Sequence, residues 1–465
     1  MTAIIALSLF GISNLFLGFW FPRKTIQMVT LLFLVVSMAL TVTDWNHELL
    51  WFGNMFRTTN TSINFSLIIQ LAAFFVVAFS KAFGQDDEHT HPAEYYAIML
   101  FSVVGAILMV SFDHMIVLFV GLEILSVAMY VLTGSDKRNL RSNEAAIKYF
   151  LMGSFTTGIL LFGITLVYGA THSFYMSNIG TILTNTAPES MPSFLFIGVL
   201  LIIVGLLFKV SAAPFHFWTP DVYEGAPTIF TMFMSTIVKT ASFAALFHLV
   251  SGIFGSLYTV WVLPVYFISM LTLVVGNISA VYQQSVKRML AFSSISHAGY
   301  LLLTVSSKQI STTSSILYYS LSYTLATVVA FAVLILVSEY QSARVEKPEN
   351  FSSFEGLAKN NPGLALCFTI SMLSLAGIPL TAGFWGKFFI FSDTFSRNII
   401  YPVILAILMS AVGIYYYFKG IIAVYLKAGE IEKIEVPVLF KMALWACTLG
   451  TIILGVYPSL VKSVF

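Results

Sequence analysis

The sequence predicts an all-α polytopic membrane protein. Of its 465 residues, 58% are hydrophobic and only 9% are charged, whereas about 25% are charged in an ordinary soluble protein. The 23 basic and 21 acidic residues are too few to cover the surface of a soluble protein of this length. Apolar runs of about 20 residues, the length that crosses a bilayer core about 30 Å thick, recur along the chain.

The composition excludes several other classes of protein. The high hydrophobicity excludes a disordered chain. A secreted disulfide scaffold is excluded because Cys367 and Cys447 are the only cysteines and both lie in apolar runs. The net charge of +2 is spread along the chain, and nucleic-acid binding is therefore not expected.

The apolar runs predict fourteen membrane-spanning helices. The first run is not a cleaved signal peptide, because Arg23 and Lys24 follow it instead of preceding it. The predicted ranges are 2–21, 25–43, 64–83, 96–112, 115–134, 145–170, 193–213, 227–250, 257–281, 288–306, 313–338, 362–391, 400–426 and 438–461.

The loops between these ranges predict the orientation, because cytoplasmic loops are enriched in lysine and arginine. Thirteen basic residues fall on one side and four on the other. The thirteen are Arg23, Lys24, Lys81, Lys137, Arg138, Arg141, Lys287, Arg288, Arg344, Lys347, Lys359, Lys427 and Lys433, and the four are Arg57, Lys308, Arg397 and Lys462. We therefore expect a bacterial cell (inner) membrane protein with both termini on the non-cytoplasmic side.

Four ionisable residues lie inside predicted spans: Glu123, Lys209, Lys239 and Lys387. A charge at the middle of the bilayer costs about 2.5–3.5 kcal/mol on insertion scales. Desolvation disfavours the charged form of lysine and glutamate, so that such groups can exchange protons with water near neutral pH. The pattern favours a proton path. Buried ion pairs that only fix helix packing remain the alternative, although such pairs stabilise proteins poorly.

Histidines extend this set of candidates. His216 lies among prolines in SAAPFHFWTPDVYEGAP, and His297 lies in SSISHAGY; we expect both in the proton relay. His248 lies in an apolar stretch, which is equally consistent with a packing role and with membership of the relay. The run Asp86–His91 is expected to be a solvated loop and not a metal site. No dinucleotide fingerprint, cysteine cluster or paired-histidine haem pattern occurs, so no cofactor or metal is expected on this chain.

Prolines predict breaks in the seventh and twelfth helices. Pro214, Pro220 and Pro227 follow Lys209, and Gly377 and Pro379 precede Lys387 in LAGIPLTAGFWGK. Proline removes a backbone hydrogen bond, and backbone freed at membrane depth must face a polar or protein-lined cavity. Broken helices at corresponding places indicate inverted repeats.

The two breaks are five helices apart, which predicts two inverted five-helix units, helices 4–8 and 9–13. The expected organisation is a three-helix segment (1–95), a first repeat (96–250), a second repeat (251–427) and a C-terminal helix (428–465).

Three longer stretches carry a family resemblance. SNEAAIKYFLMGSFTTGILLFG, FKVSAAPFHFWTPDVYEGAPT and KRMLAFSSISHAGYLL resemble subunit N of the proton-pumping NADH:quinone oxidoreductase, respiratory complex I. The resemblance covers essentially the whole chain and is clearest over 110–430. Subunits L and M and the Mrp-type Na⁺/H⁺ antiporter subunits instead carry a variant near WLPDAH or WLPDAM.

The resemblance implies roles for the ionisable residues. Glu123 matches the glutamate that pairs with the seventh-helix lysine, here Lys209. Lys239 matches the central lysine of helix eight, and Lys387 matches the helix-twelve residue near the proton exit. His216 and His297 match positions on the polar axis of the family.

The resemblance also implies a function and partners. The chain would couple quinone reduction elsewhere in the complex to proton transfer through the buried Glu/Lys/His relay. Its partners would be other membrane subunits, of the subunit M type and smaller ones, and the lipid bilayer. NADH, FMN, iron–sulfur clusters and a quinone would be used by the complex and not bound by this chain. An Mrp-type antiporter subunit and a passive membrane scaffold remain alternatives.

Overall fold

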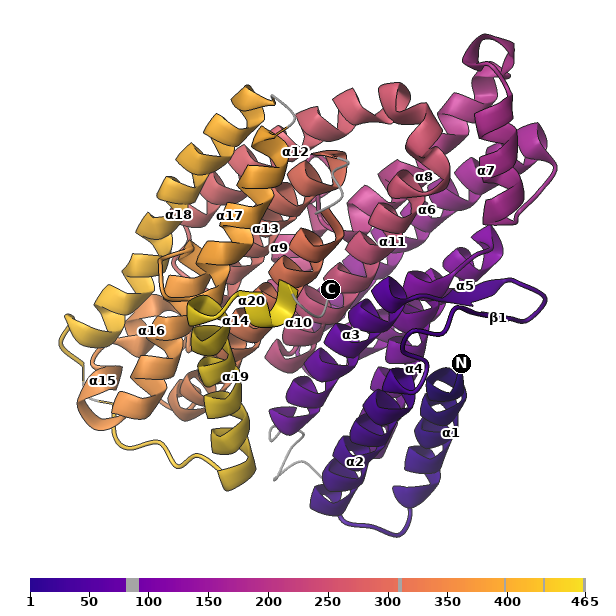
Figure 1. Ribbon diagram of the computed structural model, residues 1–465. Helices are drawn as coiled ribbons and strands as arrows, with labels where there is room; N and C mark the ends of the chain where they lie inside the picture. Colours follow the sequence, from indigo (N-terminus) through magenta and orange to yellow (C-terminus); the bar gives the residue numbers. More distant parts are fainter. Residues whose placement is uncertain (81–91, 308–311, 397–398, 430, 463–465) are drawn as a thin grey trace.

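The computed structural model describes residues 1–465 except 81–91, 308–311, 397–398, 430 and 463–465. The predicted solvated loop Asp86–His91 lies outside the described residues. Most of the described chain is helical, and the helices lie side by side in one bundle (Figure 1). The predicted all-α class is therefore confirmed.

Eleven helices within the described residues are long and apolar enough to cross a membrane. They are α2 (Arg23–Val42), α3 (Asn60–Ala78), α4 (Pro92–Ser111), α5 (Met115–Thr133), α6 (Leu140–Thr171), the continuous α10–α11 (Thr228–Ser251), α12 (Tyr258–Val281), α13 (Val286–Ser307), α14 (Thr312–Gln341), α18 (Ile400–Tyr425) and α19 (Val438–Val456).

Shorter elements complete the fold. The shorter helices are α1 (Thr2–Leu17), α7 (Met176–Asn185), α8 (Ser193–Lys209), α9 (Trp218–Gly225), α15 (Leu357–Asn360), α16 (Pro362–Ala376), α17 (Ala382–Phe395) and α20 (Ser459–Lys462). Among the described residues, 3₁₀ turns form η2 (Pro188–Ser190), η4 (Ile253–Leu257) and η5 (Phe351–Phe354). An antiparallel hairpin, β1 (Leu49–Trp51) with β2 (Phe56–Thr58), was not expected from the sequence.

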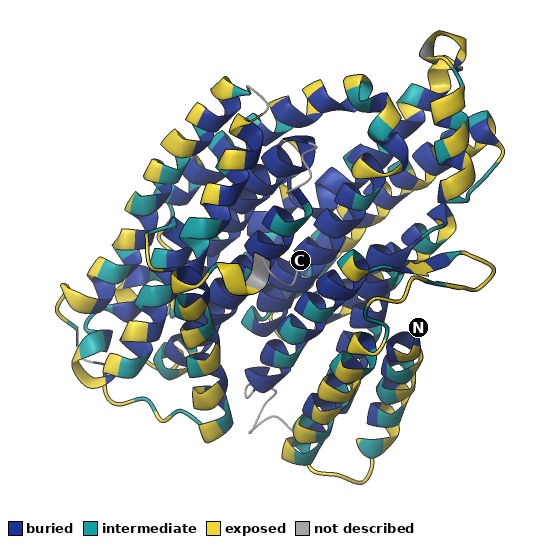
Figure 2. Cartoon of the chain, in the orientation of Figure 1, coloured by how far each residue is buried: buried dark blue, intermediate teal, exposed yellow. Residues whose placement is uncertain are grey.

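A central group of helices is buried and an outer group is exposed. Every residue in the most apolar stretch of α10–α11 and of α13 is buried, and α14 is almost as deeply enclosed. Helices α1, α2, α6 and α18 instead expose large apolar side chains, such as Leu9, Phe155 and Ile404 (Figure 2). Apolar surface of this extent fits contact with lipid or with other membrane proteins. The ionisable residues Lys239 and His297 lie on the buried central helices.

Both predicted helix breaks are present. Helix α8 ends at Lys209 and α9 begins at Trp218, with Ser211 between them in the left-handed region at φ 64°. Helix α16 ends at Ala376 and α17 begins at Ala382. Gly377 (φ 82°) makes this second turn, and a Cβ there would lie 2.8 Å from Cδ of Lys387. Each break therefore sits against a buried lysine.

Candidate functional site

Lys239 lies at the centre of the bundle. Lys239 is 2% exposed, and its Nζ donates hydrogen bonds to both the carbonyl and the hydroxyl oxygen of Ser294 on α13. The ring centre of Tyr323, on α14, lies 5.9 Å from the same nitrogen. A single π-helical turn, η3 (Met234–Val238), directly precedes Lys239, and such turns interrupt helices at functional sites.

His297 lies one turn after Ser294 on α13 and is bonded on both ring nitrogens. Its Nδ1 is 2.5 Å from the hydroxyl of Tyr319, and its Nε2 is 3.1 Å from the hydroxyl of Tyr417. The Tyr417 hydroxyl is also bonded to Ser293. An imidazole and a hydroxyl can each accept one hydrogen bond while donating another, which is the requirement for passing a proton onward.

Lys387 lies at the second break, on α17. Its Nζ donates to the carbonyl of Ala376 at 2.8 Å and to the hydroxyl of Ser410 at 2.9 Å. The ring centre of Tyr300, one turn beyond His297 on α13, lies 5.0 Å from this nitrogen. Ser410 and Tyr417 are seven residues apart on α18 and so share one face of that helix, about 10 Å apart. Polar groups therefore lie at intervals between Lys239 and Lys387, and the widest interval is the one between Tyr417 and Ser410.

Lys209 is bonded to hydroxyls and not to a carboxylate. Its Nζ donates to Ser126 at 2.8 Å and contacts Tyr130 at 3.3 Å. Both lie on α5 at three and seven residues after Glu123, which is half-buried. Glu123 acts electrostatically on Lys209, but the two form no direct ion pair in the part of the chain that the structure describes. The pairing implied by the resemblance is thus replaced by a hydroxyl contact here.

His216 lies in the first break and is 8% exposed. Its ring packs against Phe217, and no side chain of the described residues bonds to its Nδ1. Within the same described chain, no hydrogen bond joins His216 to any of the three lysines. Aromatic rings pack beside Lys209: the ring centre of Tyr149 lies 5.8 Å from its Nζ, and Trp218 stacks on Tyr149 with 4.6 Å between ring centres.

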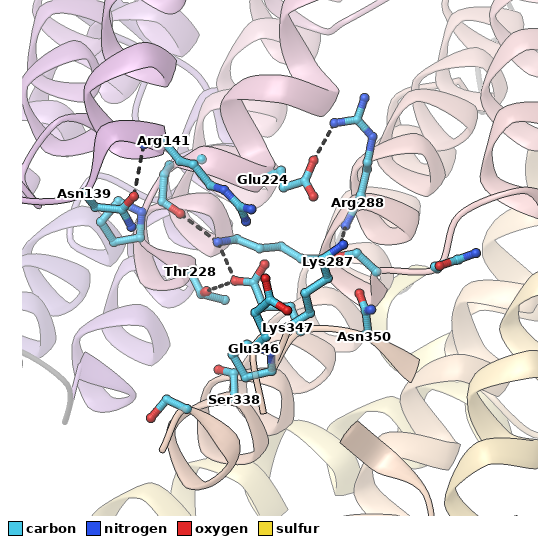
Figure 3. A pocket seen from close by; sticks show the side chains of 18 of the residues that line it. Asn139, Arg141, Glu224, Thr228, Lys287, Arg288, Ser338, Glu346, Lys347 and Asn350 are labelled. Atoms are coloured by element: carbon cyan, nitrogen blue, oxygen red, sulfur yellow. Dashed lines mark hydrogen bonds and ion pairs between the residues drawn. The ribbon is translucent and has the colours of Figure 1, made fainter. Parts of the chain in front are cut away.

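A polar cavity of about 660 Å³ opens on the face that carries the basic loops (Figure 3). At its wall Lys287 donates to the carbonyl of Ala226 at 2.8 Å and to Glu349 at 2.9 Å. Ala226 is the C-cap residue directly after α9 and precedes Pro227, so the ammonium group neutralises the negative end of a half-helix. Arg288 bonds to Asp221 and to Glu224, both on α9.

A Glu144–Lys148 ion pair at the start of α6 joins this network. The two side chains are 2.7 Å apart, and Lys148 also contacts Asp221 at 2.8 Å. These ion pairs fix α9 to α6 and α13, which holds the short half-helix in place beside its break.

We expect Lys287→Ala to destabilise the protein by about 2–3 kcal/mol, because a buried carbonyl and a carboxylate both lose their charged donor. Thermal unfolding of the purified complex measures this effect as a lower midpoint. The matched control is Lys347→Ala, because Lys347 lines the same cavity but is exposed. Equal midpoints for the two variants would contradict a bracing role for Lys287.

The sequence analysis missed the hydroxyl partners of the lysines. Ser294, His297 and Tyr300 recur at every third residue of α13, a spacing that does indicate one polar stripe along a helix. No comparable spacing in the sequence marks Tyr319, Tyr417 and Ser410, because their partners come from other helices.

The buried groups of the site can donate and accept protons. No group of three or more histidine, cysteine, aspartate or glutamate side chains among the described residues could hold a metal ion. The buried lysines, the imidazole and the hydroxyls provide proton donors and acceptors at membrane depth. Ionisable groups at that depth mark ion and proton pathways in membrane proteins.

Comparison with known proteins identifies the family. The family described as "NADH:quinone oxidoreductase/Mrp antiporter, TM" matches residues 113–413. NADH-quinone oxidoreductase subunit N of Cytophaga hutchinsonii is 41% identical over 100% of this chain and 99% of its own, and that of Flavobacterium psychrophilum is 38% identical over 99% of each.

Solved structures agree with the sequence comparison. A chain in respiratory complex I from Thermus thermophilus is 33% identical, with a TM-score of 0.84 over 99% of this chain and 98% of that one. A chain of the Mrp complex from Dietzia sp. DQ12-45-1b has a TM-score of 0.84 over 100% of this chain and 96% of that one, but at 19% identity it shares the fold alone. The chain therefore belongs to the family of NADH-quinone oxidoreductase subunit N, the antiporter-like membrane subunits of respiratory complex I.

Proposed function

We propose that this chain transfers protons across the membrane as subunit N of respiratory complex I, driven by quinone reduction elsewhere in the complex. The observation that carries the proposal is the polar row from Lys239 through Ser294, His297 and Tyr417 toward Lys387. These groups come from four helices and all are buried. Ionisable groups are costly to place at membrane depth, and proton transfer gives a reason for that cost.

The relay begins at Lys209 in this proposal. Among the described residues Lys209 bonds to Ser126 and not to Glu123, although Glu123 acts on it electrostatically. A side-chain movement would therefore form or break their ion pair. Forming the pair favours a charged Lys209, and breaking it favours release of a proton. Lys239 and Lys387 would carry the proton onward, with His297 between them. His216 would take part from the first break.

The membrane arrangement is part of the same proposal. Fourteen spans result if α1 counts as one span and the pairs α8–α9 and α16–α17 count as one broken span each. Residues 96–250 and 251–427 would then form the two inverted repeats, flanked by 1–95 and 428–465. The basic loops would face the cytoplasm of a bacterium, with both termini outside.

The proposed partners are the other membrane subunits of the complex, including one of the subunit M type. NADH, FMN, iron–sulfur clusters and quinone would be used by the complex and not bound by this chain. The Mrp-type alternative has less support, because the likeness to the Mrp chain is confined to the fold, whereas the subunit N relatives match over the whole chain.

Purification of the tagged chain from mild-detergent membranes tests the proposal. We expect an assembly that oxidises NADH, reduces a quinone and contains other membrane subunits. After reconstitution into liposomes, NADH oxidation should acidify one side. Recovery of small hydrophobic partners without NADH oxidation, together with sodium-dependent proton exchange, would contradict the proposal and favour the antiporter alternative.

A further inference from the structure

A second polar cavity, of about 590 Å³, lies on the face opposite the basic loops. Its wall is formed by the ends of four helices, α3, α4, α11 and α14, together with the hairpin strand β2. His248 and Ser251 line it from α11, and Thr313 lines it from α14. The Arg57–Glu48 ion pair, with 3.0 Å between its atoms, lies at the same cavity.

One face of α11 connects the cavity to the level of Lys239. The cavity is lined by Ala244, Phe247, His248 and Ser251, whose spacing is that of a single helical face. Thr240 continues this face one turn deeper. It is 4% exposed and is the residue next to Lys239, about 16 Å from Ser251 along the helix axis.

A matching face of α14 carries unpartnered hydroxyls. Thr313, Ser320 and Thr324 are spaced seven and four residues apart and so point in nearly the same direction. Ser320 is 2% exposed and Thr324 is fully buried. Neither hydroxyl has a hydrogen-bond partner among the described residues. Buried hydroxyls without a protein partner are typical of sites that hold ordered water.

The two faces reach the same depth. Thr324 lies eleven residues beyond Thr313 and Thr240 lies eleven residues before Ser251, so both are about 16 Å below the cavity. The contact between Lys239 and the ring of Tyr323, which precedes Thr324, agrees with this register. The hydroxyls of Ser320 and Thr324 thus lie at the depths between the cavity and Lys239.

We propose that this cavity is the mouth of a proton path that runs from Lys239 past Thr324 and Ser320 to the face opposite the basic loops. This inference rests on the proposed function, because it needs Lys239 to exchange protons. Each hydroxyl, or a water bound to it, accepts a proton on one side and donates another on the opposite side. Lys239 then has two outlets for its proton, this path to the cavity and the polar row toward Lys387. His248 supplies a titratable group at the mouth.

Thiol accessibility tests the path directly. Ser320→Cys and Thr324→Cys are introduced singly into the whole complex, in sealed membrane vesicles of both orientations. The probe is a small, membrane-impermeant cationic methanethiosulfonate. Ser251→Cys, at the exposed rim, is the positive control. Ser269→Cys is the negative control, because Ser269 is buried and donates to the carbonyl of Gly299.

We expect Ser320→Cys to react from the face opposite the basic loops about tenfold or more faster than Ser269→Cys, because a thiol reacts only where water and reagent reach it. Thr324→Cys should react from the same face more slowly, and modification at Ser320→Cys should lower NADH-driven pumping. The baseline reaction is measured on the chain without an introduced cysteine, whose own cysteines, Cys367 and Cys447, are buried.

Two outcomes would overturn the proposed path: no reaction at Ser320→Cys from that face, or reaction at Thr324→Cys only from the basic-loop face. Pumping by the Lys239→Ala variant shows whether such an outcome contradicts only the path or also the proposed function. Loss of pumping there, combined with either outcome, refutes the path while leaving the relay in place. Retention of pumping there removes the relay and the path together.

Discussion

Lys239→Ala is expected to lower NADH-driven proton pumping on the order of tenfold or more while the complex still assembles. General acid–base groups contribute about 10²–10⁴-fold to proton transfer, and Lys239 donates directly to Ser294 at the start of the polar row. Alanine removes the proton carrier together with its charge. The vacated volume is buried, so a modest loss of stability is also expected.

The measurement is acidification by the reconstituted complex, divided by NADH oxidised in the same sample. Lys441→Ala is the matched control, because Lys441 is exposed on α19 and its loss removes the same charge from the chain. Assembly is checked by the recovery of the other subunits. An unchanged ratio of protons to NADH in an assembled Lys239→Ala complex would exclude Lys239 from the relay. Loss of assembly would favour the scaffold alternative.

The sequence predicted the helices and the buried charges for a direct physical reason. The bilayer penalises each polar residue strongly, so a lysine such as Lys239 within an apolar run stands out without any structure. Prolines and glycines likewise mark the two breaks, because their backbone effects are local. The break residues Ser211 and Leu380 both have positive φ, which is a consequence of those local turns.

The partners of the charges could not be predicted in the same way. Serine and tyrosine are tolerated almost anywhere in a membrane helix, so Ser294 and Tyr417 carry no penalty that would reveal them. Their importance depends on which helices pack together, and here α11, α13 and α18 meet. The same limit explains Lys209, whose contacts with Ser126 and Tyr130 replace the implied pairing with Glu123. Which of several nearby polar groups a buried lysine bonds to depends on small differences in the distances between helices.

Tyr417→Phe is the second substitution with a large expected effect. The Tyr417 hydroxyl contacts both His297 and Ser293, and phenylalanine removes only that oxygen. His297 would keep Tyr319 as a partner but lose its contact on the side of α18, where Ser410 leads to Lys387. We expect pumping to fall by about tenfold or more, and the unpaired groups to cost about 1–3 kcal/mol.

Tyr415→Phe is a close control, because Tyr415 lies two residues away on α18 with 64% of its surface exposed. Both variants keep the ring, so helix packing is matched, and acidification per NADH oxidised compares them. If both pump equally well, the proton does not cross from His297 to α18 through this hydroxyl. A route along α13 would then be favoured, because Tyr300 already lies over the ammonium group of Lys387. Tyr300→Phe in the Tyr417→Phe background would distinguish these routes, since only a proton passing through Tyr300 requires its hydroxyl.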